Sequence, residues 1–110
     1  MQKIKKEKYT LILCKESSFI DSYNFILENI ENLKNYNIII DLLDFSSLEK
    51  KDFLLFFDIN ETFKKNKKSL VLVNKIADIE NLPETLNIAP TIIEGEDIIE
   101  MEEIERELGF

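Results

Sequence analysis

The carboxylates are the side chains of this sequence that could do chemistry, but they lack the partners that most catalytic sites use. The 110 residues include 22 Asp and Glu and no histidine. Histidine is the commonest general base near neutral pH, the usual activator of serine and cysteine nucleophiles, and a common zinc ligand. Gly95 and Gly109 are too far apart to form a phosphate-binding loop. We therefore expect no catalytic residue, no metal site and no cofactor, and we predict that the chain is not an enzyme.

The densest group of acids comprises Glu100, Glu102, Glu103, Glu105 and Glu107. Two carboxylates at a suitable separation could serve as the acid and base of a hydrolase. These acids, however, lie on a predicted amphipathic helix, which indicates a solvated face. The segment also lacks the Asp-x-Asp-x-Asp-Gly pattern of a calcium loop. We expect an exposed acidic ridge at this place rather than an active site.

Asp41 lies near the end of a buried apolar run, the position at which open α/β sheets put functional residues. The phosphoacceptor aspartates of receiver domains occupy such a position, together with an acidic pair after the first strand. Here Cys14, Lys15 and Glu16 follow the first apolar run, so the acidic pair is absent. We expect Asp41 to cap the loop that follows it.

Short apolar runs predict the strands that would position these residues. Such runs are too short for helices, and continuous β-branched runs favour strands that are buried on both faces. The predicted strands are residues 9–14, 37–43, 69–73 and 86–89. The second of them is expected to be central, and a piece around residues 3–5 could pair with the first as a hairpin.

Capping residues that precede apolar positions at intervals of three and four predict the main helices. The predicted caps are Ser18 with Asp21, Ser46 with Glu49, and Thr91 with Glu94. The expected buried faces are, in order, Phe19, Tyr23, Ile26, Leu27, Ile30 and Leu33; Phe53, Leu54, Phe56, Phe57, Ile59 and Phe63; and Ile92, Ile93, Ile98 or Ile99, Met101, Ile104 and Leu108. The weaker segment 76–86 is expected to hold a short helix before Pro83.

Strands that alternate with helices predict an α/β layered domain with parallel pairing. The length suits one core, so we expect residues 1–110 to form a single domain with a sheet of about four to five strands. The single cysteine, Cys14, lies beside an apolar run and is expected to be buried. No apolar run is long enough for a signal peptide or a spanning helix, which favours a reducing cytoplasm and no contact with a membrane.

The net charge of −8 disfavours nucleic acid as a direct partner. Binding to nucleic acid depends on Lys and Arg side chains that replace the counterions of the phosphate backbone. The basic cluster at residues 64–68 follows a predicted helix, where it complements the helix dipole. A protein is therefore the expected partner.

The order of elements and a few short motifs resemble a STAS domain, the family that includes the anti-sigma-factor antagonists. The resemblance rests on residues 38–48, the Phe/Leu-rich helix after them, the strand that follows Lys67 and Lys68, and residues 91–94 at the start of the last helix. In that family a buried strand ends in Asp-Leu, as Asp41 and Leu42 do here. The resemblance covers residues 9–110 in element order, and it implies an α/β fold and a regulatory, non-catalytic role in a bacterium.

The phosphorylated motif of that family, Asp-Ser-Ser-Gly, aligns without a gap with residues 49–52, which read Glu-Lys-Lys-Asp. No hydroxyl therefore stands at the phosphorylated position. Ser46 and Ser47 precede this position, and one of them is expected to be the helix cap. The closing residues 100–110 also resemble the end of small STAS-like proteins from Bacteroidetes-type bacteria, which are often encoded beside a ribonuclease Z.

These features favour a non-enzymatic, cytoplasmic protein-interaction module of STAS-like type with a regulatory role. The predicted partner-binding residues are Asp44, Ser46, Ser47, Glu49, Lys50, Lys51 and Asp52. The alternative is an accessory partner or regulator of an RNA-processing enzyme such as ribonuclease Z, which it would bind through the acidic C-terminal helix without cutting RNA itself. The sequence leaves open the identity of the partner, the oligomeric state and the binding of a small ligand.

Overall fold

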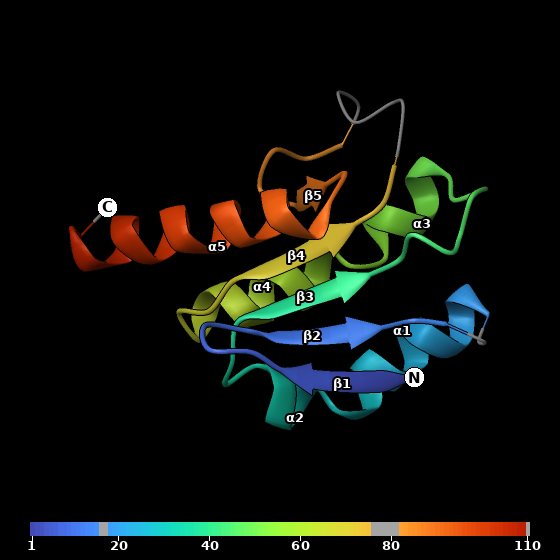
Figure 1. Cartoon of the computed structure of the whole chain (residues 1–110), viewed down its shortest axis with the longest axis horizontal. Helices are drawn as coiled ribbons and strands as arrows, with labels where there is room; N and C mark the ends of the chain where they lie inside the picture. The colour runs from blue at the N-terminus through green and yellow to red at the C-terminus, as the bar shows by residue number, and fades with distance from the viewer. Residues whose placement is uncertain (16–17, 76–81, 110) are drawn as a thin grey trace.

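Five strands form one mixed sheet in the computed structural model, which describes residues 1–15, 18–75 and 82–109 (Figure 1). The strands are β1 (Gln2–Lys5), β2 (Thr10–Leu13), β3 (Ile38–Asp41), β4 (Leu70–Val73) and β5 (Asn87–Ala89). They lie side by side in sequence order; β1 pairs with β2 in an antiparallel hairpin, and all other neighbours are parallel. The predictions of an α/β sheet, of a central strand within residues 37–43, which is β3, and of an N-terminal hairpin are therefore confirmed.

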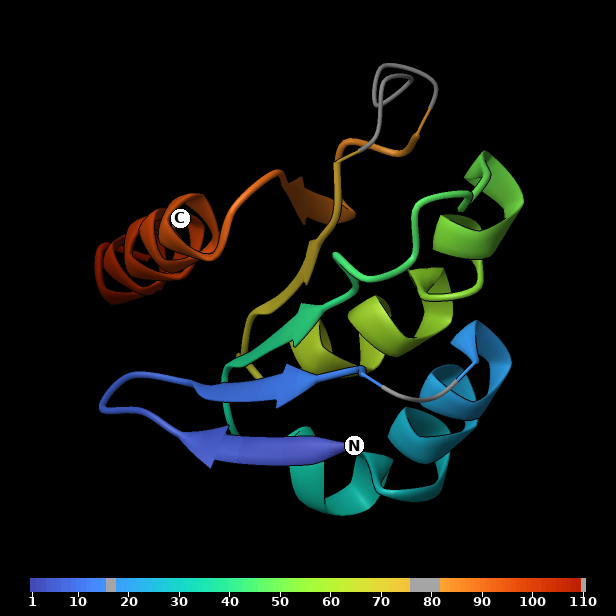
Figure 2. The same cartoon turned by 45° about the vertical axis from the view of Figure 1, so that its right-hand side comes forward.

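The helices lie in two layers on opposite faces of this sheet (Figure 2). One layer contains α1 (Phe19–Glu28), α2 (Ile30–Leu33), α3 (Lys50–Leu54) and α4 (Phe57–Lys65), and the other is α5 (Ile92–Glu107). The predicted second helix is divided into α3 and α4 at Leu55 and Phe56. The short helix predicted for residues 76–86 falls mostly on residues 76–81, outside the described residues, and residues 82–86 form bends and turns.

The strands contribute to a core on each side of the sheet, because successive residues of a strand point to opposite faces. The core under α1 to α4 includes Ile38, Ile40, Leu70, Leu72, Phe53, Phe56 and Phe63. The core under α5 includes Tyr9, Leu11, Ile39, Val71, Val73, Ala89 and Ile99. Burial on both faces explains why the sequence of these strands is apolar without alternation.

Two of the predicted helix caps are confirmed. Ser18 Oγ accepts a hydrogen bond of 3.1 Å from Asp21 N at the start of α1, and Thr91 Oγ1 accepts one of 3.1 Å from Glu94 N at the start of α5. Each side chain satisfies an amide that has no partner within the helix. These caps fix where the two longest helices begin.

Burial was predicted for Leu27 and Leu54, and both side chains are exposed. In α1, Ser22 is buried instead, with its Oγ donating to the carbonyl oxygen of Ser18 at 3.1 Å. The buried side of α1 is therefore centred on Ser22 and Ile26, and Leu27 lies outside it. Between α3 and α4, the helix is broken at Leu55 and Phe56. With this break Phe53 and Phe56 both point into the core, and Leu54 stays on the outside.

α5 packs on the sheet with a different face from the predicted one. Ile99 is buried, but Ile93, Met101, Ile104 and Leu108, all predicted to be docked, are exposed. Gly95 is also buried, and a Cβ atom at this position would lie 3.3 Å from both Ile39 Cδ1 and Val71 Cγ1. The missing side chain lets the helix backbone approach β3 and β4 closely, and this approach directs the Gly95 and Ile99 side of the helix inward.

Candidate partner-binding site

The predicted partner-binding residues lie at the carboxyl edge of the parallel strands, in the connection from β3 to α3 and in the first turn of α3 (Figure 1). Six of the seven are exposed, and Asp52 is half-buried. Between them, Phe45 and Leu48 are half-buried and pack against the core under α1 to α4. The ring of Phe45 meets that of Phe19 edge to face, with centroids 6.0 Å apart. Apolar anchors thus hold a connection whose polar side chains face solvent.

The backbone of this connection is also held by side chains at two strand ends. Asn74 is buried just after β4, and its Nδ2 donates to the carbonyl oxygens of Leu42 at 2.7 Å and Phe45 at 2.9 Å. Asp41 Oδ1 accepts a hydrogen bond of 2.9 Å from Leu43 N. The prediction that Asp41 caps the following loop is confirmed. The role of Asn74 was missed, although an amide directly after an apolar strand was visible in the sequence.

The predicted serine cap of the second helix is wrong. The N-cap of α3 is Glu49, and Asp52 Oδ2 accepts a hydrogen bond of 2.8 Å from Glu49 N, as the third helical residue does in a capping box. Ser46 and Ser47 lie before the cap in an exposed turn. The helix begins later than predicted because the chain between β3 and α3 first turns to bury Phe45 and Leu48. Of the predicted residues, Glu49 and Asp52 are thus brought into direct contact.

Exposed leucines border the polar residues of the loop. Leu43 precedes the loop, and Leu54 and Leu55 follow it at the end of α3; all three are more than a third exposed. We name Leu43, residues 44–52, Leu54 and Leu55 the edge surface. Its mixture of exposed apolar and charged side chains is suited to binding a protein, because such interfaces combine an apolar centre with a polar rim.

Cys14 lies beside this edge at the end of β2, where its amide nitrogen donates to the carbonyl oxygen of Asp41 at 3.3 Å. Burial raises the pKa of the Cys14 thiol; a hydrogen bond with Ser22 lowers it in part, and the negative charge of Asp41 raises it. The net rise keeps the thiol protonated near neutral pH, and the thiol is a much weaker nucleophile than the thiolate. The prediction that Cys14 is buried is confirmed.

The acids of α5 form an exposed ridge only in part. Glu100, Glu105 and Glu107 are exposed, as predicted, but Glu102 and Glu103 are half-buried. Glu102 Oε1 accepts a hydrogen bond of 2.6 Å from Ser69 Oγ, and its Oε2 accepts one of 2.9 Å from Asn87 Nδ2.

Asn37 completes this contact by donating from Nδ2 to Glu103 Oε1. The donors Asn37, Ser69 and Asn87 stand at the starts of β3, β4 and β5, so the second half of α5 is held on the amino edge of the sheet. The edge surface lies at the opposite edge. The polar residues before the strands were the sequence signal for this contact, but their helical partners could not be identified from spacing alone.

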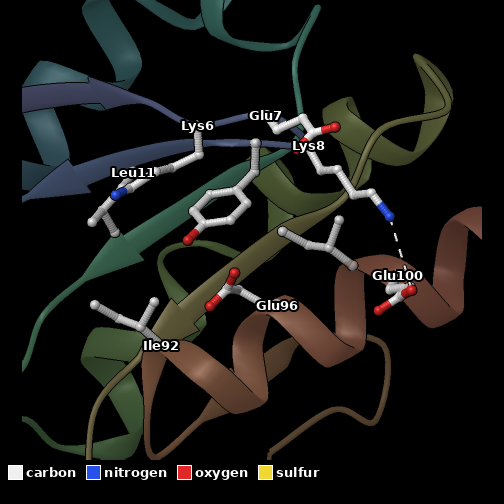
Figure 3. A pocket seen from close by; sticks show the side chains of 9 residues that line it. Lys6, Glu7, Lys8, Leu11, Ile92, Glu96 and Glu100 are labelled. Atoms are coloured by element: carbon white, nitrogen blue, oxygen red, sulfur yellow. Dashed lines mark ion pairs between the residues drawn. The ribbon is translucent and has the colours of Figure 1, made fainter.

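A cavity of about 590 Å³ lies between the turn that joins β1 to β2 and the helix α5 (Figure 3). Lys6 and Lys8 line it from the turn, and Glu96 and Glu100 line it from α5. Lys8 Nζ and Glu100 Oε1 are 3.8 Å apart, and both side chains are more than half exposed, so this ion pair adds little stability. Burial raises the pKa of Tyr9 in the cavity wall, and the charge of Glu96 and a hydrogen bond with it raise it further. None of the predicted site residues lines this cavity.

Within residues 1–15, 18–75 and 82–109, no group of three or more His, Cys, Asp and Glu side chains is placed to hold a metal ion. In that same part of the chain, no helix combines the length and the apolar character needed to cross a membrane. No known protein-family model matches the sequence, and no curated protein matches it significantly.

Proposed function

We propose that the chain is a non-enzymatic, regulatory protein-interaction module of STAS-like type, which binds a protein partner in the cytoplasm through the edge surface. The observation that carries this proposal is a fixed backbone that presents exposed side chains. Asn74, Asp41 and Asp52 fix the backbone between β3 and α3. A partner would meet a surface that needs little ordering on binding, and such preorganisation raises affinity.

The chemistry of the edge surface suggests what the partner must offer. Lys50 and Lys51 are exposed in the first turn of α3 and favour acidic side chains on the partner. Leu54 and Leu55 lie one turn further along and favour an apolar patch beside those acids. The partner-binding residues predicted from the sequence and the bordering leucines would then act together.

Affinity purification of the tagged chain from its native cells tests the proposal. The wild type is compared with a Lys50→Glu, Lys51→Glu variant, and a Lys3→Glu, Lys6→Glu variant in the exposed hairpin serves as a control with the same change in charge. We expect the recovered protein to be lost from the first variant and retained by the second. If the recovered partner is a sigma-regulatory kinase, this result would support the STAS-like role. A partner recovered equally with all three chains would contradict binding through the edge surface.

A second candidate function is an accessory partner or regulator of an RNA-processing enzyme such as ribonuclease Z. The observation that favours it is the set of exposed acids on α5, Glu100, Glu105 and Glu107, because an enzyme that binds RNA presents a basic surface. In this case the same purification would recover a nuclease. The nuclease would be lost on Glu105→Lys, Glu107→Lys substitution and retained by the Lys50→Glu, Lys51→Glu variant. The opposite pattern would exclude binding through α5.

A further inference from the structure

The outer face of α5 carries apolar side chains that the sheet does not cover. Ile93, Met101, Ile104 and Leu108 are 71%, 62%, 50% and 65% exposed. Their spacing along the sequence places them on one side of the helix, opposite Gly95 and Ile99, and they extend over about 22 Å at 1.5 Å per residue. We name these four residues the outer stripe. The exposed Asp97 lies on the same side of the helix between Ile93 and Met101, so the unbroken apolar part of the outer stripe is Met101, Ile104 and Leu108. Single exposed apolar residues are common on proteins, but three in a row along one helix mark a surface that binds.

Acidic side chains border the outer stripe on both sides. Glu100 and Glu107 lie on the side of the β1–β2 turn, where Glu100 is within 3.8 Å of Lys8. Glu94 and Glu105 lie on the side of β5, and all four acids are exposed. The second half of the helix therefore presents an apolar row between two acidic rows, and Asp97 adds a negative charge at the start of that row.

This arrangement of charge disfavours a second copy of the chain as the occupant. Apart from Arg106, every charged residue of α5 is acidic. Two outer stripes packed against each other would bring acidic rows together, and like charges across an interface repel each other. The acidic rows are also repelled by the anionic surface of a membrane. An occupant of opposite charge is required.

We propose that the outer stripe docks a basic amphipathic helix of a partner protein. Apolar side chains of that helix would pack on Met101 and Ile104 at the centre of the stripe, as ridges on one helix pack into the grooves of another. Lys or Arg side chains beside its apolar face would pair with the acidic rows, as charged residues do beside the seam of a coiled coil. The inference does not depend on the edge surface, because α5 lies on the other side of the sheet from α3 (Figure 2).

A synthetic peptide of leucine and lysine tests the docking of such a helix. The peptide is about four helical turns long, with its leucines on one face, and its dissociation constant is measured by fluorescence anisotropy. For a Met101→Ser, Ile104→Ser variant of the full chain we expect that constant to rise by about tenfold or more, because two apolar contacts are lost. An Ile20→Ser, Leu27→Ser variant is the matched control, because these exposed apolar side chains lie on α1, and it should bind as the wild type does.

The charged rows are tested in the same assay. Glu105→Gln with Glu107→Gln should weaken binding more than Glu28→Gln with Glu84→Gln, which removes the same charge at other exposed positions. Circular dichroism verifies that each variant is folded. Equal affinity for the wild type and the Met101→Ser, Ile104→Ser variant would overturn the proposal. So would sedimentation showing that the wild type dimerises through the stripe, or stripe-dependent binding to phosphatidylcholine vesicles.

Discussion

Asn74 illustrates how one side chain fixes the candidate binding loop. Its buried amide donates to carbonyl oxygens on both sides of the turn after β3. A buried polar group that loses its partner costs about 1–3 kcal/mol, so the loop and Asn74 hold each other in place. Asp41 and Asp52 act in the same way at the two ends of the loop, where each accepts a backbone hydrogen bond.

The cap of α3 gives a prediction at the scale of single residues. Asp52→Ala should lower the free energy of unfolding by about 1 kcal/mol, because Asp52 Oδ2 accepts the hydrogen bond from Glu49 N. Ser46→Ala and Ser47→Ala should change it by less than about 0.5 kcal/mol, because these side chains lie in an exposed turn. Urea denaturation of the three variants measures both effects. A loss of about 1 kcal/mol at either serine would place the cap there instead.

At the scale of the element, α5 has two apolar sides and uses only one of them to pack on the sheet. Ile99→Ala should lower the free energy of unfolding by about 2–5 kcal/mol, because a buried side chain is removed from between the helix and the sheet. Ile104→Ala should change it by no more than about 0.5 kcal/mol. Thermal and urea melts of this pair of variants measure the difference. Comparable losses in both would mean that Ile104 also packs on the sheet.

The glutamates of α5 give a second matched comparison. Glu102→Ala removes the acceptor for Ser69 Oγ and Asn87 Nδ2 and should lower the free energy of unfolding on the order of 1–2 kcal/mol. Glu105→Ala on the exposed side of the same helix should have almost no effect. Chemical denaturation of both variants is the measurement. A chain that tolerates both substitutions equally would show that the polar contact at the amino edge adds no stability.

The strands could be predicted from the sequence because each is a short, unbroken apolar run. Residues on both faces of these strands are buried, so apolar residues occupy positions that point to either face. The side of α5 that packs on the sheet could not be predicted, because the helix has two sets of apolar residues at helical spacing. One set is Ile92, Ile98 and Ile99, and the other is the outer stripe. Only the approach of Gly95 to β3 and β4 decides between them.

The candidate loop was located from the sequence, but its internal contacts were predicted only in part. Two pairs of residues have the spacing of an N-cap and its partner at the start of α3: Ser46 with Glu49, and Glu49 with Asp52. The local sequence does not decide which pair caps the helix. Packing of Phe45 and Leu48 on the core decides in favour of the second pair. The amide of Asn74 comes from a different strand, and contacts between distant segments leave no periodic signal.

At the scale of the whole molecule, the edge surface and α5 differ in charge and lie on different parts of the fold. The edge surface combines acids with Lys50 and Lys51, whereas α5 is acidic except for Arg106. With a net charge of −8, the chain as a whole is repelled by phosphate backbones.

The purified chain should therefore leave structured RNA uncut, with or without added zinc, because it contains no histidine to ligate the metal and has the wrong charge for the substrate. Gel analysis of labelled RNA after prolonged incubation provides the measurement. Metal-dependent cleavage that follows the chain through several columns, and that disappears when carboxylates of the chain are substituted, would contradict this expectation.

The central claim is that a protein partner binds at the edge surface, and nuclear magnetic resonance tests it most directly. The partner recovered from native cells is titrated into the isotope-labelled chain, and the shifts of the backbone amides are followed residue by residue. We expect the largest changes from Leu43 to Leu55, with a distinct and separable response on α5 only if a basic helix is also present. Changes that spare the loop between β3 and α3 altogether, while the partner binds, would contradict the claim.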